Sequence, residues 1–187
     1  MSGHPISGAW GRAAGMMVVV SRADSGTRND EKARQMTENT RPAGIIVIVA
    51  AVIVDTAGRL LLVRKRGTGR FMQAGGKIDP GEAPADALAR ELHEEIGVAV
   101  ASSDLEFLGR FDADAANEAG FVVDARVYAA DLGARAAEAV ASAEIDRLVW
   151  VTPAEALALP LAPLTRDVLM PLLVERAARA AAGPAAV

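Results

Sequence analysis

Four glutamates near the middle of the chain have a spacing that could hold a divalent cation. Glu82 is separated by seven residues from Arg90, which is followed by Glu91, Glu94 and Glu95. Hard cations such as Mg²⁺ prefer carboxylate oxygens, and a bound cation would offset the repulsion between like charges three or four residues apart on a helix. Packing alone does not explain such a cluster of acids, so the segment points to chemistry.

A helix predicted over about residues 83–96 would position these acids. Pro84 suits its first turn, and Gly97 is placed to end it. At 100° per residue, the three glutamates after Arg90 lie within roughly a 100° arc beside an apolar stripe. The stripe consists of Ala85, Leu88, Ala89, Leu92 and Ile96. The helix can therefore be anchored in a core while it presents ligands.

Acids on a helix most often form a solvated face, and two features favour a site here. The preceding loop holds the run Gly75–Lys77, where backbone can approach a ligand closely and a cation can meet a phosphate. Arg90 stands among the acids, where it can pair with Glu82 or Glu94 and fix the loop on the helix. We assign Arg90 to that structural role ahead of catalysis.

The segment resembles the signature of the Nudix hydrolases. That signature is G-x5-E-x7-R-E-U-x-E-E-x-G-U, in which U is a bulky aliphatic residue. All nine specified positions are matched, by Gly76, Glu82, Arg90, Glu91, Leu92, Glu94, Glu95, Gly97 and Val98. A chance match at nine fixed positions is very improbable. The signature covers residues 76–98, and a fuller likeness runs from about Gly44 to Pro171.

The resemblance implies an α/β fold, in which helices sandwich a mixed β-sheet and the signature forms a loop, a helix and a loop. It also implies Mg²⁺- or Mn²⁺-dependent hydrolysis of a pyrophosphate bond in a nucleoside diphosphate linked to another group, X. We expect a (d)NTP or an oxidised NTP as substrate, because the phosphate loop is similar to that of triphosphate-cleaving relatives. ADP-ribose or a nucleotide sugar is the alternative substrate.

Two other functions on this fold are weighed against hydrolysis. A catalytically silent nucleotide sensor is one alternative, but such proteins usually lose signature acids, and all of them are present here. An isomerase acting on isopentenyl diphosphate would use a catalytic cysteine, and the chain has no cysteine. The expected enzyme is therefore a Nudix-type pyrophosphohydrolase that acts on phosphoric anhydrides.

By the same resemblance, the metal ligands are Glu91, Glu94, Glu95 and the carbonyl oxygen of Gly75. All three glutamates are also candidate catalytic residues, and Glu91 is a candidate general base. Lys77 looks placed for a phosphate, and Arg90 is grouped with it as a binding residue. His93 occupies a variable position of the signature, and we expect it at the surface or behind the ligands.

A further acid far along the chain completes the expected catalytic set. In triphosphate-cleaving relatives, an acid six residues before a tryptophan contacts metal, and Glu144 precedes Trp150 by six residues. An exposed acid at a strand edge is the equally weighted alternative. Glu144 and Glu91 remain alternative general bases, and Glu118, in a loop expected over residues 112–120, is a third.

The rest of the substrate should lie against residues outside the signature. The available stacking groups and donors are Phe71, Phe121, Arg126, Tyr128 and Trp150. Aromatic residues on strands belong to the core more often than to a base-binding platform, and that alternative holds for each of them.

Composition bounds the class of protein. The chain has 187 residues, a net charge of −4 and no basic stripe, which argues against stable nucleic-acid binding. Its longest apolar run, Ile45–Val54, is too short to span a bilayer. We therefore expect a cytoplasmic protein with a nucleotide as its partner, either a monomer or a homodimer.

The expected organisation is one domain over residues 43–182, after a disordered segment or extension over 1–42 and before a loose tail over 183–187. Ile45–Val54 and Leu60–Lys65 read as a strand hairpin, and Pro153–Leu157 as a short helix. The other predicted elements are strands at 71–74, 121–131 and 148–151, one or two strands within 99–111, and a final helix over 164–182 that Pro171 interrupts or starts.

Overall fold

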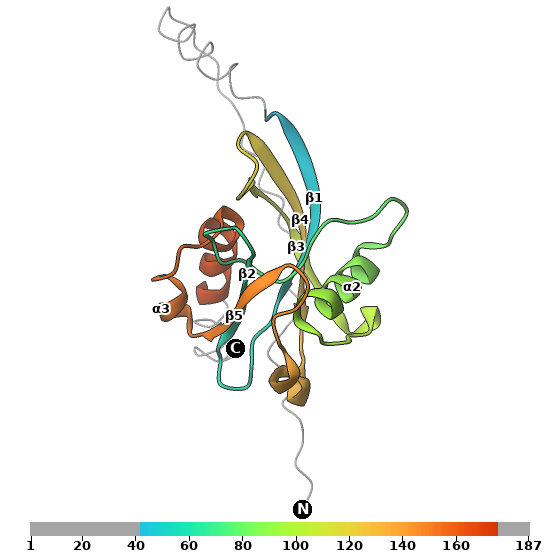
Figure 1. Cartoon of the computed structure of the whole chain (residues 1–187), viewed down its shortest axis with the longest axis vertical. Coiled ribbons are helices and arrows are strands. Elements are labelled where there is room, and N and C mark those ends of the chain that lie inside the picture. Colours follow the sequence, from blue (N-terminus) through green and yellow to red (C-terminus); the bar gives the residue numbers. More distant parts are fainter. Residues whose placement is uncertain (1–41, 176–187) are drawn as a thin grey trace, which may run out of the picture. The chain divides into compact units, whose positions relative to one another are not determined.

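A computed structural model of the chain describes residues 42–175 (Figure 1). The segment 1–41 and the tail 183–187 lie outside the described residues, so the domain boundaries stay predictions. The strands are β1 (Gly44–Val52), β2 (Leu60–Lys65), β3 (Leu105–Asp114), β4 (Phe121–Ala130) and β5 (Ile145–Val151). The helices are α2 (Pro84–Ile96), α3 (Pro153–Ala156), the 3₁₀-helices η1 (Ser102–Asp104) and η2 (Gly133–Glu138), and the π-helix η3 (Leu164–Leu169).

The strands form two sheets. In the larger sheet, β4 lies between β1, which is parallel to it, and β3, which is antiparallel. The smaller sheet pairs β2 with β5 in antiparallel orientation. The larger sheet is therefore mixed, as the sequence predicts.

The predicted hairpin of β1 and β2 is wrong beyond its turn. Their pairing is confined to a single bridge between Val54, just after the end of β1, and Leu60, and the two strands join different sheets. The reason is that the free edge of β1 is taken by the segment 74–77. Val49 N–H donates to the Gly76 carbonyl at 2.9 Å, and Ala51 N–H donates to the Ala74 carbonyl at 2.9 Å. The segment 74–77, called the glycine loop from here on, is thus held directly against β1.

Side chains of β1, β2 and β4 alternate between two apolar cores, one on each face. The first core contains Val49, Ala51 and Ile53 of β1 together with the apolar stripe of α2. The second contains Val52 of β1 with Leu164, Leu169 and other residues of the C-terminal helices. Figure 1 shows α2 on one side of the strands, with α3 and the C-terminal helix on the other. This is the predicted arrangement of helices around a sheet.

The predicted boundaries of α2 are confirmed to within one residue. Gly97 ends the helix in the left-handed region, with φ at 70°. The loop predicted over 112–120 is shorter, because β3 continues to Asp114. The final helix begins as the π-helix η3 and continues past Pro171 as far as the last described residue, 175; the predicted part from 176 to 182 lies outside the described residues. A widened turn just before Pro171 suits the proline ring, which would clash with the preceding turn of an α-helix.

Candidate active site

The glycine loop passes so close to its neighbours that side chains are excluded. Gly75 has φ at +144°, and a Cβ atom there would lie 2.2 Å from the Val49 carbonyl oxygen. A Cβ atom on Gly76 would lie 2.4 Å from the carboxyl carbon of Glu91. The backbone of β1 therefore confines one side of the loop, and a candidate ligand of α2 confines the other. Glycine is needed at both positions for different reasons.

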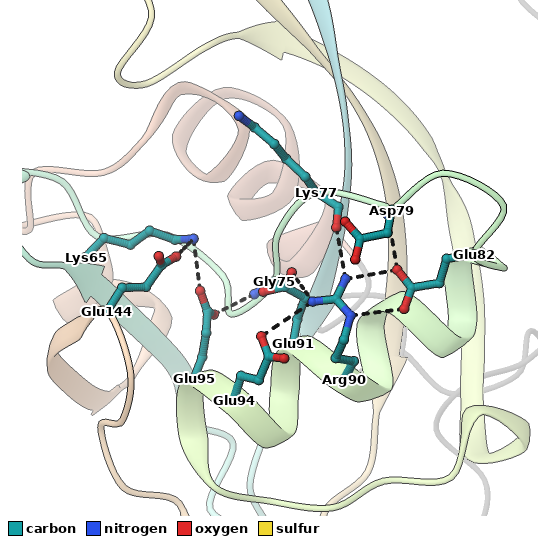
Figure 2. Close-up of polar contacts among 10 residues, drawn as sticks. All are labelled: Lys65, Gly75, Lys77, Asp79, Glu82, Arg90, Glu91, Glu94, Glu95 and Glu144. Atoms are coloured by element: carbon teal, nitrogen blue, oxygen red, sulfur yellow. Dashed lines mark hydrogen bonds and ion pairs between the residues drawn. The ribbon is translucent and has the colours of Figure 1, made fainter.

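Arg90 joins the loop to the helix, as the sequence predicts (Figure 2). Its Nε and Nη2 atoms donate to the two carboxylate oxygens of Glu82 at 3.0 and 2.9 Å. Nη2 also donates to the Lys77 carbonyl at 3.2 Å, and Nη1 reaches Glu91 at 2.8 Å and Glu94 at 3.4 Å. Hydrogen bonds to Glu82 and then to Glu91 raise the pKa of Arg90 above its ordinary value. This fork of donors is geometry that lysine cannot reproduce.

The contacts between Arg90 and Glu82, called the loop clamp here, should break in acid. Hydrogen bonds from Arg90 and from the Asp79 backbone hold the pKa of Glu82 below its ordinary value. A lowered carboxyl pKa contributes stability above the ordinary value, and that stability is lost as pH falls through the lowered pKa. We expect the protection factors of the backbone amides of residues 78–82 to fall as pH drops through the lowered pKa of Glu82. Glu82→Gln should show the same loss of protection at pH 7; unchanged protection in this variant would contradict the clamp.

Glu95 is the buried acid of the signature. Its side chain is 1% exposed, one oxygen accepts a hydrogen bond from Gly75 N–H at 2.8 Å, and Oε1 lies 3.0 Å from Lys65 Nζ. Burial raises the pKa of Glu95, although the charge of Lys65 and the Gly75 hydrogen bond oppose that effect. Oε1 has the ion pair but no partner with hydrogen-bond geometry among residues 42–175.

Lys65 brings Glu144 to the same place. Its ammonium also forms a hydrogen-bonded ion pair with Glu144, which comes from the turn before β5 (Figure 2). Burial would lower the pKa of Lys65, but the charge of Glu95 and the hydrogen bond to Glu144 together raise it. No motif in the sequence predicts Lys65 as a site residue. Its only signal is a position at the end of β2, and pairing between distant segments cannot be read from spacing.

A cleft of about 480 Å³ lies over these residues. All five predicted catalytic and metal-binding positions line it, and so does Lys77, which extends away from the glutamates in Figure 2. The acids on its wall are Glu91, Glu94, Glu95, Asp114, Glu118 and Glu144. Within the described part of the chain, no three acidic or histidine side chains converge on one point. Glu91 and Glu94 are instead engaged by Arg90, and Glu95 by Lys65.

The five candidate base-contacting residues do not reach this cleft. None of Phe71, Phe121, Arg126, Tyr128 and Trp150 is among the residues that line it. Phe71 and Tyr128 are buried in the two cores, and Trp150 packs against the first core. Because side chains alternate between the two faces of a strand, these three aromatic side chains pack in or against the cores, which was the alternative interpretation. His93 is exposed, as expected.

Comparison with known proteins assigns the family. The model of the NUDIX domain matches residues 45–173. The chain belongs to the Nudix family. It is 34% identical over 146 residues to a CTP pyrophosphohydrolase of Escherichia coli, a match that covers 73% of this chain and 98% of that protein. It is therefore a Nudix-type hydrolase of pyrophosphate bonds. Within the described residues, no helix is long and apolar enough to cross a membrane.

Another sequence relative and two solved structures are also similar to this chain. An 8-oxo-dGTP diphosphatase of Haemophilus influenzae is 38% identical over 65 residues, 33% of this chain and 48% of that protein. The solution structure of the E. coli ORF135 protein superposes with a TM-score of 0.54 at 30% identity and covers 76% of this chain and 96% of that one. A MutT protein from Methanosarcina mazei, with a TM-score of 0.58 at 22% identity over 73% of this chain and 96% of that one, supports the fold alone.

Proposed function

We propose that this Nudix hydrolase is a divalent-metal-dependent pyrophosphohydrolase of nucleoside triphosphates, ordinary or oxidised. The observation that carries the proposal is the cleft in which the glycine loop, the glutamates of α2 and Glu144 meet. The names of the CTP- and 8-oxo-dGTP-cleaving relatives support a triphosphate substrate. A pyrophosphate chain is the part of such a substrate that suits a narrow loop bordered by acids and lysines.

The donors on α2 fit a hard cation. Glu91, Glu94 and Glu95 supply carboxylate oxygens, and Gly75 can add its carbonyl oxygen, an all-oxygen set of the kind Mg²⁺ and Mn²⁺ take. Glu95 Oε1 is a buried oxygen that has the ion pair with Lys65 but no partner with hydrogen-bond geometry among residues 42–175, so it keeps a lone pair that a cation could take. The chemistry that Mg²⁺ supplies when bound is charge neutralisation on phosphate oxygens and acidification of a water.

The chain's own residues have three tasks in this proposal. The glycine loop lets phosphate approach the backbone closely, and Arg90 keeps the loop at a constant place on α2. Lys65 and Lys77 add positive charge on the cleft wall, where phosphate oxygens would lie. A carboxylate, Glu91 or Glu144, accepts the proton as water attacks phosphorus, and the leaving phosphate oxygen keeps the electrons of the broken bond.

The two candidate bases differ in their surroundings. The Glu91 side chain is 12% exposed and bound by Arg90, whereas that of Glu144 is 58% exposed and bound by Lys65. Glu118 also lines the cleft and stays a third candidate. The pH profile of kcat distinguishes them, because replacing the base by glutamine should remove the acidic limb of the profile.

The proposal is tested by a substrate panel. We expect purified protein with Mg²⁺ to hydrolyse CTP or another (d)NTP, 8-oxo-dGTP included, faster than ADP-ribose. Turnover should stop with a chelator and return with Mg²⁺ or Mn²⁺. Mass spectrometry of products formed in ¹⁸O-water identifies the phosphorus that is attacked. Binding without turnover would favour the silent sensor, and faster hydrolysis of ADP-ribose or a nucleotide sugar would overturn the triphosphate assignment.

A further inference from the structure

Gln73 is a buried amide in the wall of the cleft that the proposed chemistry does not use. It is 4% exposed and lies two residues before Gly75 in the chain. Its Oε1 accepts a hydrogen bond at 2.8 Å from the hydroxyl of Thr165, which is fully buried. Its Nε2 has no hydrogen-bond partner among residues 42–175. A buried donor without a partner is costly and therefore calls for an explanation.

The surroundings of Gln73 suit one part of a nucleotide. Both Gln73 and Thr165 line the cleft, which also carries apolar side chains of Ile48, Val123 and Leu164. Apolar walls with a few fixed polar groups are typical of sites for small molecules. Two residues of chain span at most about 7 Å, so the amide lies within reach of a substrate whose phosphates meet the glycine loop.

No aromatic side chain of the described residues lines the cleft. A base held there would rest against aliphatic walls, which give little discrimination between bases, because every base has an apolar face. Discrimination then depends on hydrogen bonds to the edge of the base. A buried group whose own orientation is held by a neighbour is suited to that task, and Thr165 holds the Gln73 amide in this way.

We propose that Gln73 is a specificity-determining residue that donates from Nε2 to the edge of the nucleobase. The inference rests on the proposed nucleotide hydrolysis and deepens it. Because Oε1 is engaged by Thr165 and Nε2 is buried without a partner among residues 42–175, the hydrogen-bonding capacity left on this amide is that of a donor. It suits an edge on which a carbonyl oxygen lies beside an unprotonated ring nitrogen, as in cytosine (O2, N3) or guanine (O6, N7). Adenine has no carbonyl oxygen beside any of its ring nitrogens and is therefore disfavoured.

The test compares nucleotides with a substrate that has no base. We expect Gln73→Leu to lower kcat/KM for the preferred cytosine or guanine nucleotide by about 10- to 100-fold, and to erase the preference over ATP. Hydrolysis of ribose 5-triphosphate should stay within about twofold of the unmodified protein, because that substrate offers nothing to the amide. Equal losses with and without a base would show a purely structural role and overturn the proposal.

Thr165 supplies the matched pair of variants. Thr165→Ser keeps the hydroxyl and should keep the base preference. Thr165→Val removes the hydrogen bond to Gln73 Oε1, so the amide can flip and present an acceptor to the base. The ratio of kcat/KM for the cytosine or guanine nucleotide to that for ATP should then fall. A preference that survives unchanged in Thr165→Val would contradict the orienting role that the 2.8 Å hydrogen bond implies.

A second measurement needs no variant and so does not depend on how Gln73→Leu folds. With the unmodified protein, 3-deazacytidine or 7-deazaguanosine triphosphate replaces the ring-nitrogen acceptor by C–H. We expect kcat/KM about tenfold or more below that of the parent nucleotide. Equal rates for parent and deaza analogues would overturn the Gln73 proposal while the hydrolase assignment stands. Absence of hydrolysis with every triphosphate would overturn the proposed function and this inference together.

Discussion

Glu95→Gln is expected to lower kcat by on the order of 10²- to 10³-fold while the protein stays folded. Glutamine keeps an oxygen that can accept the Gly75 N–H hydrogen bond, so the glycine loop keeps its attachment. It removes the negative charge that the proposed metal site and Lys65 need. Initial-rate kinetics with saturating Mg²⁺ and a thermal melt measure the two expectations. Glu94→Gln, at an exposed position on the same cleft, should lower kcat by a similar factor.

The stability of the same variant supplies a separate readout. Because burial raises the pKa of Glu95 in the folded protein, its ionised form disfavours folding relative to a neutral group of the same shape. In metal-free buffer, the unmodified protein should therefore gain stability as pH falls through that raised pKa. Glu95→Gln should lack this gain and be at least as stable near pH 7. Lost activity without lost stability is the pattern of a functional acid.

Glu138→Gln is the matched control for both acids. Glu138 is exposed, lies in η2 and is not among the residues that line the cleft. The same loss of one carboxylate there should leave turnover unchanged. Near-normal rates in both Glu94→Gln and Glu95→Gln would overturn the metal-site assignment. A slow Glu138→Gln would show that net charge matters more than the arrangement on α2.

Gly75→Ala is expected to lower the free energy of unfolding by about 2–5 kcal/mol and to abolish activity. Its φ of +144° lies outside the region that alanine adopts readily, and the new Cβ would meet the Val49 carbonyl oxygen at 2.2 Å. That oxygen belongs to β1, which pairs along its length with β4, so it cannot retreat without disturbing the sheet. Urea unfolding and initial rates measure the effects.

Alanine substitutions at two other glycines distinguish the effect of backbone strain from the effect of steric contact. Gly67 also has a positive φ, +78°, but nothing lies within 4 Å of the Cβ position, so Gly67→Ala reports strain alone and should be milder. Gly76→Ala would meet the end of the flexible Glu91 side chain, which can move. It should stay nearly as stable as the unmodified protein and lose activity by displacing a candidate ligand. Equal destabilisation in all three variants would contradict this reading of the loop.

Local spacing explains which parts of the site could be predicted. Positions along one helix are related by a constant rotation, so the face shared by the glutamates and the stripe of α2 follows from sequence separation. The pairing of Arg90 with Glu94 was predictable for the same reason, since they are four residues apart on α2, whereas the pairing with Glu82 depends on the turn that leads into the helix. The stop at Gly97 followed from glycine's tolerance of positive φ.

Strand neighbours could not be predicted in the same way. A strand has two edges, and nothing in the run Ile45–Val54 tells which segment will occupy each of them. The nearest segment, Leu60–Lys65, looked like a hairpin partner, but β4 took one edge of β1 and the segment 74–77 the other. The five side chains proposed for base contact depended on the same choice. Once the strands were paired, alternation placed Phe71 and Tyr128 in the cores.

The family and the reaction class follow from the spaced signature, and the face shared by the glutamates of α2 follows from their separation, because a helix converts spacing directly into a shared face. The contacts of Lys65 with Glu95 and Glu144, and the contact of Gln73 with Thr165 in the wall of the same cleft, depend on the tertiary structure. These contacts join segments far apart in the chain. They exist because burial of two apolar cores brings β2, the glycine loop and the C-terminal helix together, and no local pattern encodes that choice.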